Sequence, residues 1–164
     1  IYEQVLPSVR KHFGNFEVIS VEEEILEPIT EFNSFDKKFK GFIDMVIKTP
    51  DQKYHIIDWK TCSWGWSKDK KSDPMTNYQL TYYKNYFSKK HQIDPKNIET
   101  YFVLLKRTAK TENVEVVRIT SGYKKTTNAL KVLENAVINI EKHNYLKNRL
   151  NCKYCKFHKT EHCK

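Results

Sequence analysis

The sequence predicts a mixed α/β fold in which helices cover a central sheet. Three observations predict it: three consecutive strand-like segments, a segment with helical periodicity that separates them from two further strands, and a long amphipathic segment after these. The order helix, three strands, helix, two strands, helix is typical of a layered α/β domain. At 164 residues the chain is long enough to bury a core of its own.

The first half of the chain is expected to supply one helix and three strands. A helix over 2–13 is closed by Gly14, because glycine readily adopts the left-handed conformation that ends a helix. Alternating apolar residues, bounded by turn residues, predict strands over 16–25, 38–48 and 53–62.

The second half begins with a polar, lysine-rich loop over 63–74. Helical periodicity then predicts a helix over 75–90, and strands follow over 98–107 and 114–120. Ser121 is the expected N-cap of a long amphipathic helix that continues to about Leu150. Its apolar stripe comprises Leu130, Leu133, Val137, Ile140 and Tyr145.

The composition favours a polyanionic partner. There are 29 Lys and Arg against 20 Asp and Glu, a formal net charge of +9, which suits nucleic acid but also fits a merely lysine-rich surface. No run of 18 apolar residues and no signal peptide are present, so we expect neither a membrane span nor secretion. The chain begins with Ile1 rather than Met, so we expect its natural N-terminus to lie upstream.

Two aspartates and a lysine carry the strongest chemical signal. Asp58 and Lys60 stand two residues apart on a predicted strand, so they project from the same face. Asp44 lies near the end of the preceding strand. Two carboxylates can hold a hard cation such as Mg²⁺ or Mn²⁺, and a neighbouring lysine suits metal-assisted hydrolysis of a phosphodiester. The alternative is a surface salt bridge between Asp58 and Lys60.

Asp44 followed by Asp58-x-Lys60 resembles the signature of the PD-(D/E)XK nuclease superfamily. The wider segments 39–46, 56–61 and 79–83 resemble its RecB-like branch, which includes the nuclease domains of RecB and AddB and the CRISPR-associated and phage exonucleases. The resemblance extends over about 18–106 and implies a restriction-endonuclease-like core.

The resemblance also implies roles for the catalytic residues. Asp44, Asp58 and the backbone carbonyl of Trp59 would bind Mg²⁺ or Mn²⁺. Lys60 would position or deprotonate the attacking water and stabilise charge on the phosphate. A glutamate is expected on the first strand; Glu22 fits best and Glu24 is second, with an exposed acidic edge strand as the alternative.

A second motif falls on the helix predicted over 75–90. Gln79 and Tyr83 stand at i and i+4, so they lie on one helix face. They match the Gln-x-x-x-Tyr motif of RecB-like nucleases, which implies contact with the active site and the DNA backbone. The alternative is a polar helix face with a half-buried tyrosine.

The loop after the third strand combines aromatic and basic side chains. Stacking on unpaired bases and contact with phosphates would suit this mixture. One tryptophan packed under the loop, with solvated lysines, is an equally reasonable interpretation. The candidate DNA-binding residues are Trp64, Trp66, Lys68, Lys70 and Lys71.

The C-terminal segment 151–164 is expected to be a metal-binding tail on a nuclease domain over 1–150. Cys152, Cys155 and Cys163 supply three thiolates, and His158 or His162 would complete a structural Zn²⁺ site. The resemblance instead implies a [4Fe–4S] cluster whose fourth cysteine precedes Ile1. Free reduced cysteines are the third possibility.

One histidine of the family pattern is missing. The resemblance places a metal-binding histidine on a helix before the first strand, but His12 lies too close to that strand to fit. We expect this histidine to precede Ile1 or to be absent.

These features predict a Mg²⁺- or Mn²⁺-dependent deoxyribonuclease. The resemblance favours an exonuclease acting on single-stranded DNA or DNA ends in recombination or repair, with a helicase or recombination protein as partner. It would work in the cytoplasm of a prokaryote or of a virus-infected cell. A non-catalytic nucleic-acid-binding module with a nuclease-like fold, or a zinc-tailed adaptor, are the alternatives.

Overall fold

The computed structural model describes residues 2–32, 36–144 and 149–163. The chain divides into two compact units, Ile1–Leu130 and Lys131–Lys164. The elements are α1 (Tyr2–Phe13), β1 (Glu17–Pro28), β2 (Lys38–Lys48), β3 (Tyr54–Cys62), α2 (Lys68–Ser72), α3 (Pro74–His91), η1 (Pro95–Asn97), β4 (Ile98–Lys106), β5 (Val114–Ile119), α4 (Tyr123–Glu141) and η2 (Arg149–Tyr154). None of the helices in the described residues is both long and apolar enough to cross a membrane.

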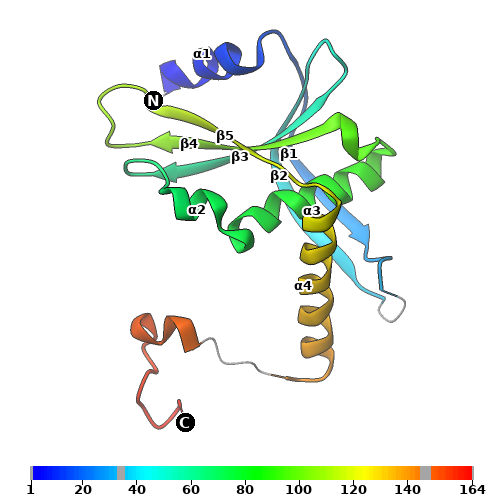
Figure 1. Ribbon diagram of the computed structural model, residues 1–164, viewed down its shortest axis with the longest axis vertical. Coiled ribbons are helices and arrows are strands. Elements are labelled where there is room, and N and C mark those ends of the chain that lie inside the picture. Colours follow the sequence, from blue (N-terminus) through cyan, green and yellow to red (C-terminus); the bar gives the residue numbers. More distant parts are fainter. Residues whose placement is uncertain (1, 33–35, 145–148, 164) are drawn as a thin grey trace. The chain divides into compact units, whose positions relative to one another are not determined.

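The first unit is built on a five-stranded sheet with the order β1-β2-β3-β4-β5 (Figure 1). Strands β3 and β4 are parallel, while the other neighbouring pairs are antiparallel. A parallel pair needs a crossover connection, and α3 provides it between β3 and β4. The predicted mixed α/β fold is therefore confirmed.

Helices α1 and α3 cover opposite faces of the sheet (Figure 1). On one face Ile47, Ile57 and Val103 are fully buried, and Phe13 of α1 packs against them. On the other face Gln79 of α3 reaches Asp58, the residue next to Ile57 on β3. Because successive side chains of a strand point to opposite faces, the two helices must lie on different sides.

Helix α3 is defined at both ends by its own sequence. Asp73 caps its N-terminus by accepting a hydrogen bond from the Thr76 amide at 2.9 Å, and Pro74 occupies the first turn, where no N–H is needed. Gln92 ends the helix in the left-handed conformation, with φ 55°. Helix α3 is therefore a fixed support for the side chains that it presents to the sheet.

The sequence predicted a loop over 63–74, but part of this segment is helical. It contains the short helix α2, which begins after Ser67; the Ser67 hydroxyl accepts a hydrogen bond from the Lys70 amide at 3.3 Å. Serine followed by Asp69 in the first turn is an N-terminal helix signal that is easily missed in so short a helix.

Helix α4 differs from prediction at both ends. It begins at Tyr123, and Ser121 does not cap it, because the Ser121 hydroxyl is bonded to Thr81 Oγ1 at 2.8 Å. It ends at Glu141 rather than near Leu150. His143 adopts φ 52°, and the amides of His143 and Asn144 bond back to Ile140 and Asn139 in a left-handed cap.

The apolar stripe predicted for α4 is only partly covered in the structure. Leu130, Leu133 and Val137 are half-buried, whereas Ile140 is 72% exposed. Tyr145, the last residue of the stripe, lies outside the described residues.

Candidate active site

The candidate site lies where the β2–β3 ladder ends. The two strands pair from Lys48↔Tyr54 to Met45↔Ile57. Beyond that last pair, the Trp59 amide donates a hydrogen bond to Asp44 Oδ2 at 2.7 Å. The Asp44 carboxylate therefore takes the place of a backbone acceptor and is fixed between the two strands.

Asp58 and Lys60 share a face of β3, as the sequence predicted. Lys60 Nζ lies 2.7 Å from Asp58 Oδ2, and Asp58 is 2% exposed, whereas the Lys60 side chain is 33% exposed. Asp58 Oδ1 accepts a hydrogen bond from Gln79 Nε2 at 2.9 Å. Apart from the Lys60 ammonium, the buried Oδ2 has no hydrogen-bond partner in the described part of the chain.

The environment of Asp58 disfavours its charge. Burial raises the pKa of its carboxyl, Lys60 lowers it, and the nearby Asp44 raises it again; the net shift is upward from the ordinary value of 3.8. A buried carboxylate held in this way gains stability from an additional cation.

Two aromatic rings lie beside Lys60 on the side of β4. Its ammonium lies 5.7 Å from the ring centroid of Phe102, and the Trp66 ring packs on Phe102 at 5.0 Å. Phe102 is fully buried, so the lysine emerges from an apolar base toward solvent. Phe102 could not be identified from the sequence, because its pairing with Asp58 in the parallel register is a tertiary feature.

Gln79 and Tyr83 both reach the site from α3. Gln79 Nε2 bonds Tyr83 Oη at 3.1 Å in addition to Asp58 Oδ1. Tyr83 is 8% exposed, and a Cβ at Gly41 would come within 2.8 Å of its ring. Glycine at position 41 therefore makes room for the tyrosine that supports Gln79.

The donor set fits a magnesium-type ion with few protein ligands. Asp44 and Asp58 supply hard carboxylate oxygens, and Asp58 Oδ2 is buried with the Lys60 ammonium 2.7 Å away. Mg²⁺ commonly uses one or two carboxylates and keeps several waters. Among the described residues, Asp44 and Asp58 are not joined by a third Asp, Glu, His or Cys side chain in a metal-binding group.

Glu22 is not gathered with the two aspartates. It stands between the residues that pair with Met45 and Ile43, hence opposite Asp44 in register, but its φ is 51° and its side chain is exposed. The left-handed backbone at Glu22 interrupts the regular alternation of side chains along β1. The alternative, Glu24, pairs with Lys40 at 2.8 Å instead.

His12 lies on the far side of the sheet. Its ring packs edge-to-face on Tyr101 at 5.6 Å, on the side covered by α1. Asp58 faces α3, so His12 is not part of the candidate site, in agreement with the sequence argument against it.

The two tryptophans of segment 63–74 differ. Trp64 is 76% exposed, whereas Trp66 packs on Phe102 with Lys70 over its ring at 4.9 Å. Lys71 is paired with Glu115. Of the predicted DNA-binding set, Trp64, Lys68 and Lys70 remain the most accessible candidates.

The cysteine tail does not form a closed ligand set. In the described residues, Cys152, Cys155 and Cys163 are free thiols and are not gathered with His158 or His162 into a metal-binding group. The Cys155 amide bonds the Cys152 carbonyl at 3.1 Å in a tight turn, but the His162 ring packs on Phe157 and lies near Glu161. The structural metal of the tail therefore stays a prediction.

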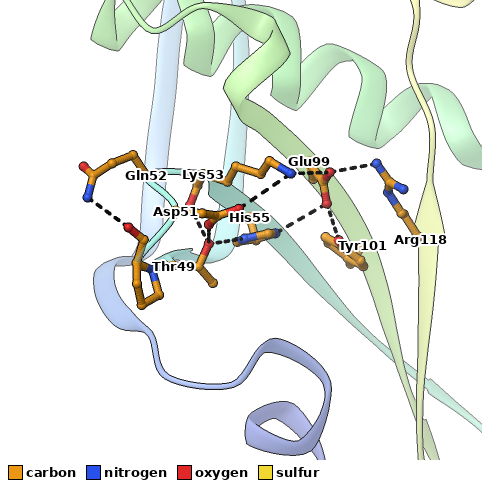
Figure 2. A network of polar contacts seen from close by, with 9 residues as sticks. Thr49, Asp51, Gln52, Lys53, His55, Glu99, Tyr101 and Arg118 are labelled. Carbon is orange, nitrogen blue, oxygen red and sulfur yellow. Dashed lines mark hydrogen bonds and ion pairs between the residues drawn. The ribbon is translucent and has the colours of Figure 1, made fainter.

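A second polar network lies on the opposite face of the same strands (Figure 2). Glu99 of β4 is its centre: it accepts a hydrogen bond from Tyr101 Oη at 2.5 Å and pairs with Arg118 at 2.7 Å. Lys53 and His55 each lie 3.8 Å from its carboxylate. His55 also bonds Thr49 Oγ1 through Nε2 at 2.9 Å.

Comparisons with known proteins agree with the fold. The fold is similar to that of SSO0001, with 22% identity and a TM-score of 0.56, over 95% of this chain and 65% of that one. It is also similar to a protein of Eubacterium rectale described as a "putative exonuclease", with 12% identity and a TM-score of 0.57, over 94% of this chain and 57% of that one. The chain thus spans less than two thirds of either protein.

The sequence comparison is more specific than the structural one. No curated protein sequence matches the chain. The profile of the PD-(D/E)XK nuclease superfamily, however, matches residues 3–160, nearly the whole chain. The chain therefore belongs to the PD-(D/E)XK nuclease superfamily.

Proposed function

We propose that this protein is a Mg²⁺- or Mn²⁺-dependent deoxyribonuclease whose active site comprises Asp44, Asp58 and Lys60. The observation that carries the proposal is the buried Asp58 carboxylate, whose pKa is raised by burial and by the nearby Asp44 carboxylate, and which lies 2.7 Å from the Lys60 ammonium.

Each side chain would have its own task in this site. Asp44 and Asp58, with the Trp59 carbonyl, would hold the ion, which when bound neutralises phosphate charge and lowers the pKa of water. Lys60 projects from an apolar base into solvent, where its ammonium can orient water and stabilise negative charge on the phosphate. Gln79 holds Asp58 Oδ1 in place, and Tyr83 in turn holds Gln79.

Several features support the RecB-like branch and an exonuclease acting on single-stranded DNA or DNA ends. The Gln79–Tyr83 pair reaches the catalytic carboxylate, as the branch motif implies. Trp64 is exposed beside the lysines of α2, which suits stacking of an unpaired base. A recombination or repair role with a helicase partner, and a cytoplasmic location, follow from the same resemblance.

Digestion of end-labelled linear and circular DNA, single- and double-stranded, tests the proposal. We expect cleavage with Mg²⁺ or Mn²⁺ and none with EDTA, and circular substrates should be resistant. Cleavage of circles would indicate an endonuclease. Metal-independent DNA binding without any cleavage would favour the non-catalytic nucleic-acid-binding module.

The structural metal of the tail is a separate proposal that rests on the sequence. Three thiolates within twelve residues remain an unusual pattern for a reducing compartment. Elemental analysis and a visible spectrum of the purified protein would separate zinc from an iron–sulfur cluster. If the purified protein contains no metal and the Cys152→Ser/Cys155→Ser variant is as stable as the parent, the tail is only a basic appendage without a structural metal.

A further inference from the structure

Two tryptophans that follow β3 have different surroundings, although a single glycine separates them. Gly65 has φ 115°, a backbone conformation that other residues rarely adopt, and a Cβ at this position would lie 3.3 Å from Glu115 Oε2. Trp64 is 76% exposed, whereas Trp66 is half-buried and its ring centroid lies 5.0 Å from that of Phe102. Glycine at position 65 therefore separates a solvent-exposed ring from a ring that packs on the sheet.

Phe102 connects Trp66 to the lysine of the candidate site. Phe102 is opposite Asp58 in the parallel β3–β4 register, so its side chain lies on the face of the sheet that carries Asp58 and Lys60. The Phe102 ring is fully buried, and Lys60 Nζ lies over it, 5.7 Å from its centroid. Contacts thus run from Trp66 through Phe102 to the Lys60 ammonium.

The segment that carries Trp66 is anchored on both sides of this residue. Before it, the Ser63 carbonyl accepts hydrogen bonds from the Thr108 amide at 3.2 Å and from the Thr108 hydroxyl at 2.5 Å. After it, Lys71 forms an ion pair with Glu115 of β5. Trp66 therefore has a defined position between two fixed points of the first compact unit.

The Lys60 ammonium has one charged and one aromatic contact, the Asp58 carboxylate at 2.7 Å and the Phe102 ring. The ammonium would share that carboxylate with any cation bound to Asp58, and like charges repel each other. The attraction between the ammonium and the ring does not depend on what Asp58 binds. Because a lysine side chain is long and flexible, the aromatic contact restricts where its charge can lie.

We propose that Trp66 is a positioning residue for Lys60, because it holds the Phe102 ring beneath the ammonium that acts on the phosphate. This inference rests on the proposed function. It also separates Trp66 from the DNA-binding residues, since one side of its environment is Phe102 and Lys70 lies over its ring at 4.9 Å. Trp64 keeps the role of stacking on an unpaired base.

The split between the cleavage rate and the affinity for DNA tests this role. Trp66→Ala should lower kcat for a single-stranded oligonucleotide about tenfold, because the cation–π contact of Lys60 is weakened. Its affinity for a fluorescein-labelled oligothymidylate in EDTA should stay within about twofold of the parent. Trp66→Phe keeps a ring on Phe102 and should restore most of the rate, whereas Phe102→Leu should repeat the loss. Trp64→Ala should instead mainly weaken binding of the oligothymidylate.

The position of Lys60 can also be measured without cleavage. In metal-free protein, the ε-methylene resonance of Lys60, assigned by its absence in Lys60→Ala, should be shifted by the ring current of Phe102. Trp66→Ala should move this resonance toward that of solvent-exposed lysines, and Trp66→Phe should move it back. A resonance that stays in place in Trp66→Ala would overturn the proposal, because the lysine would then not depend on the tryptophan.

The matched control for lost packing is Tyr54→Ala. Tyr54 is also half-buried, but it lies at the start of β3 and packs on Phe87 at 6.1 Å. Its removal should lower the melting temperature without changing kcat. If Tyr54→Ala lowers kcat as much as Trp66→Ala does, the effect is general destabilisation and the proposal is wrong. The proposal is equally wrong if Trp66→Ala loses affinity for the oligothymidylate as strongly as it loses kcat.

The outcome is separable from that of the proposed function. Cleavage by the parent and none by Lys60→Ala, together with a normal kcat in Trp66→Ala, would refute the positioning role and keep the nuclease. A parent that does not cleave with Mg²⁺ or Mn²⁺ would refute the nuclease, while the Lys60 resonance would still show whether Trp66 positions the lysine.

Discussion

Two carboxylates on adjacent strands of this sheet have opposite electrostatic environments. Asp58 of β3 faces α3, and Glu99 of β4 belongs to the network on the α1 face (Figure 2). Burial alone would raise the pKa of both. For Asp58 the net shift is upward, whereas for Glu99 the Tyr101 hydroxyl, Arg118, Lys53 and His55 outweigh burial and lower the pKa.

The difference lies in the number of partners. Glu99 has a hydroxyl donor and an arginine within 2.7 Å, and two further basic side chains near it. Asp58 has one amide donor, one lysine and a second carboxylate nearby. A saturated carboxylate stabilises the fold, while an unsaturated one is available for an added cation or substrate. Figure 2 therefore shows a carboxylate that is surrounded by donors, although Nδ1 of His55 in the same network is buried without a hydrogen-bond partner among the described residues.

Lys60→Ala should have the largest effect on activity. Removing the ammonium beside Asp58 should lower the cleavage rate by about 10³-fold or more, because it acts on charge that develops in the transition state. DNA binding measured in EDTA should remain nearly unchanged. Lys48→Ala, which removes the same charge from β2, is the control. Cleavage within a few-fold of the parent would remove Lys60 from the mechanism.

Asp44→Asn and Asp58→Asn should each abolish measurable Mn²⁺ binding and cleavage, since each removes one of the two carboxylates proposed to hold the ion. Calorimetric titration with Mn²⁺ measures the first effect directly. Asp51→Asn changes a carboxylate in the turn between β2 and β3 and should bind the ion normally. Unchanged affinity in both site variants would place the metal elsewhere.

Gln79→Ala and Tyr83→Phe should lower the cleavage rate by about 10–100-fold, or about 1–3 kcal/mol of transition-state stabilisation. Gln79 orients Asp58, and Tyr83 orients Gln79, so both act through the carboxylate. Asn85→Ala on the same helix breaks only a bond to Glu31 and should spare turnover. A lower melting temperature with normal turnover would mean that the pair merely packs α3 on the sheet.

Local periodicity was sufficient to place the central residues of the candidate site. Asp58 and Lys60 share a face because strands repeat every two residues, and Gln79 and Tyr83 meet because helices bring i and i+4 together. These contacts are set by backbone geometry within one element, which a sequence displays. Their catalytic roles stay predictions.

The structural features that the sequence did not reveal depend on tertiary contacts or on unusual backbone conformations. Ser121 is a typical N-cap residue, but its hydroxyl is hydrogen-bonded to Oγ1 of Thr81, forty residues away in the sequence. His143 ends α4 with a positive φ that glycine would normally signal, and Glu22 breaks the alternation of β1 in the same way. A single sequence gives no sign that a histidine or a glutamate adopts this conformation.

The comparison of the two carboxylates also predicts opposite effects on stability, smaller than the effects on activity. In metal-free buffer at neutral pH, Glu99→Gln should lower the free energy of unfolding by about 1–3 kcal/mol, because Arg118 and Lys53 lose their charged partner. Asp58→Asn should leave stability unchanged or raise it, since it removes a buried charge with little compensation. Urea unfolding of both variants in EDTA measures the difference, and destabilisation of both to the same extent would contradict it.

The pH dependence of these two effects gives the most discriminating test of the comparison. The pKa of Glu99 lies below its unfolded value of about 4.5, so its contribution is complete above that pH and is lost as the pH falls through the lower folded value. The cost of Glu99→Gln should therefore vanish in acid. The pKa of Asp58 lies above its unfolded value of about 3.8, so its ionised form weakens the fold at neutral pH and protonation relieves this as the pH falls. Any gain in stability from Asp58→Asn should likewise disappear in acid, although this gain and the cost of Glu99→Gln have opposite signs.

Added Mn²⁺ should stabilise the parent and the Glu99 variant but not the Asp58 variant. A ligand stabilises only a protein that binds it in the folded state, so this result would identify Asp58 as the carboxylate that binds the ion.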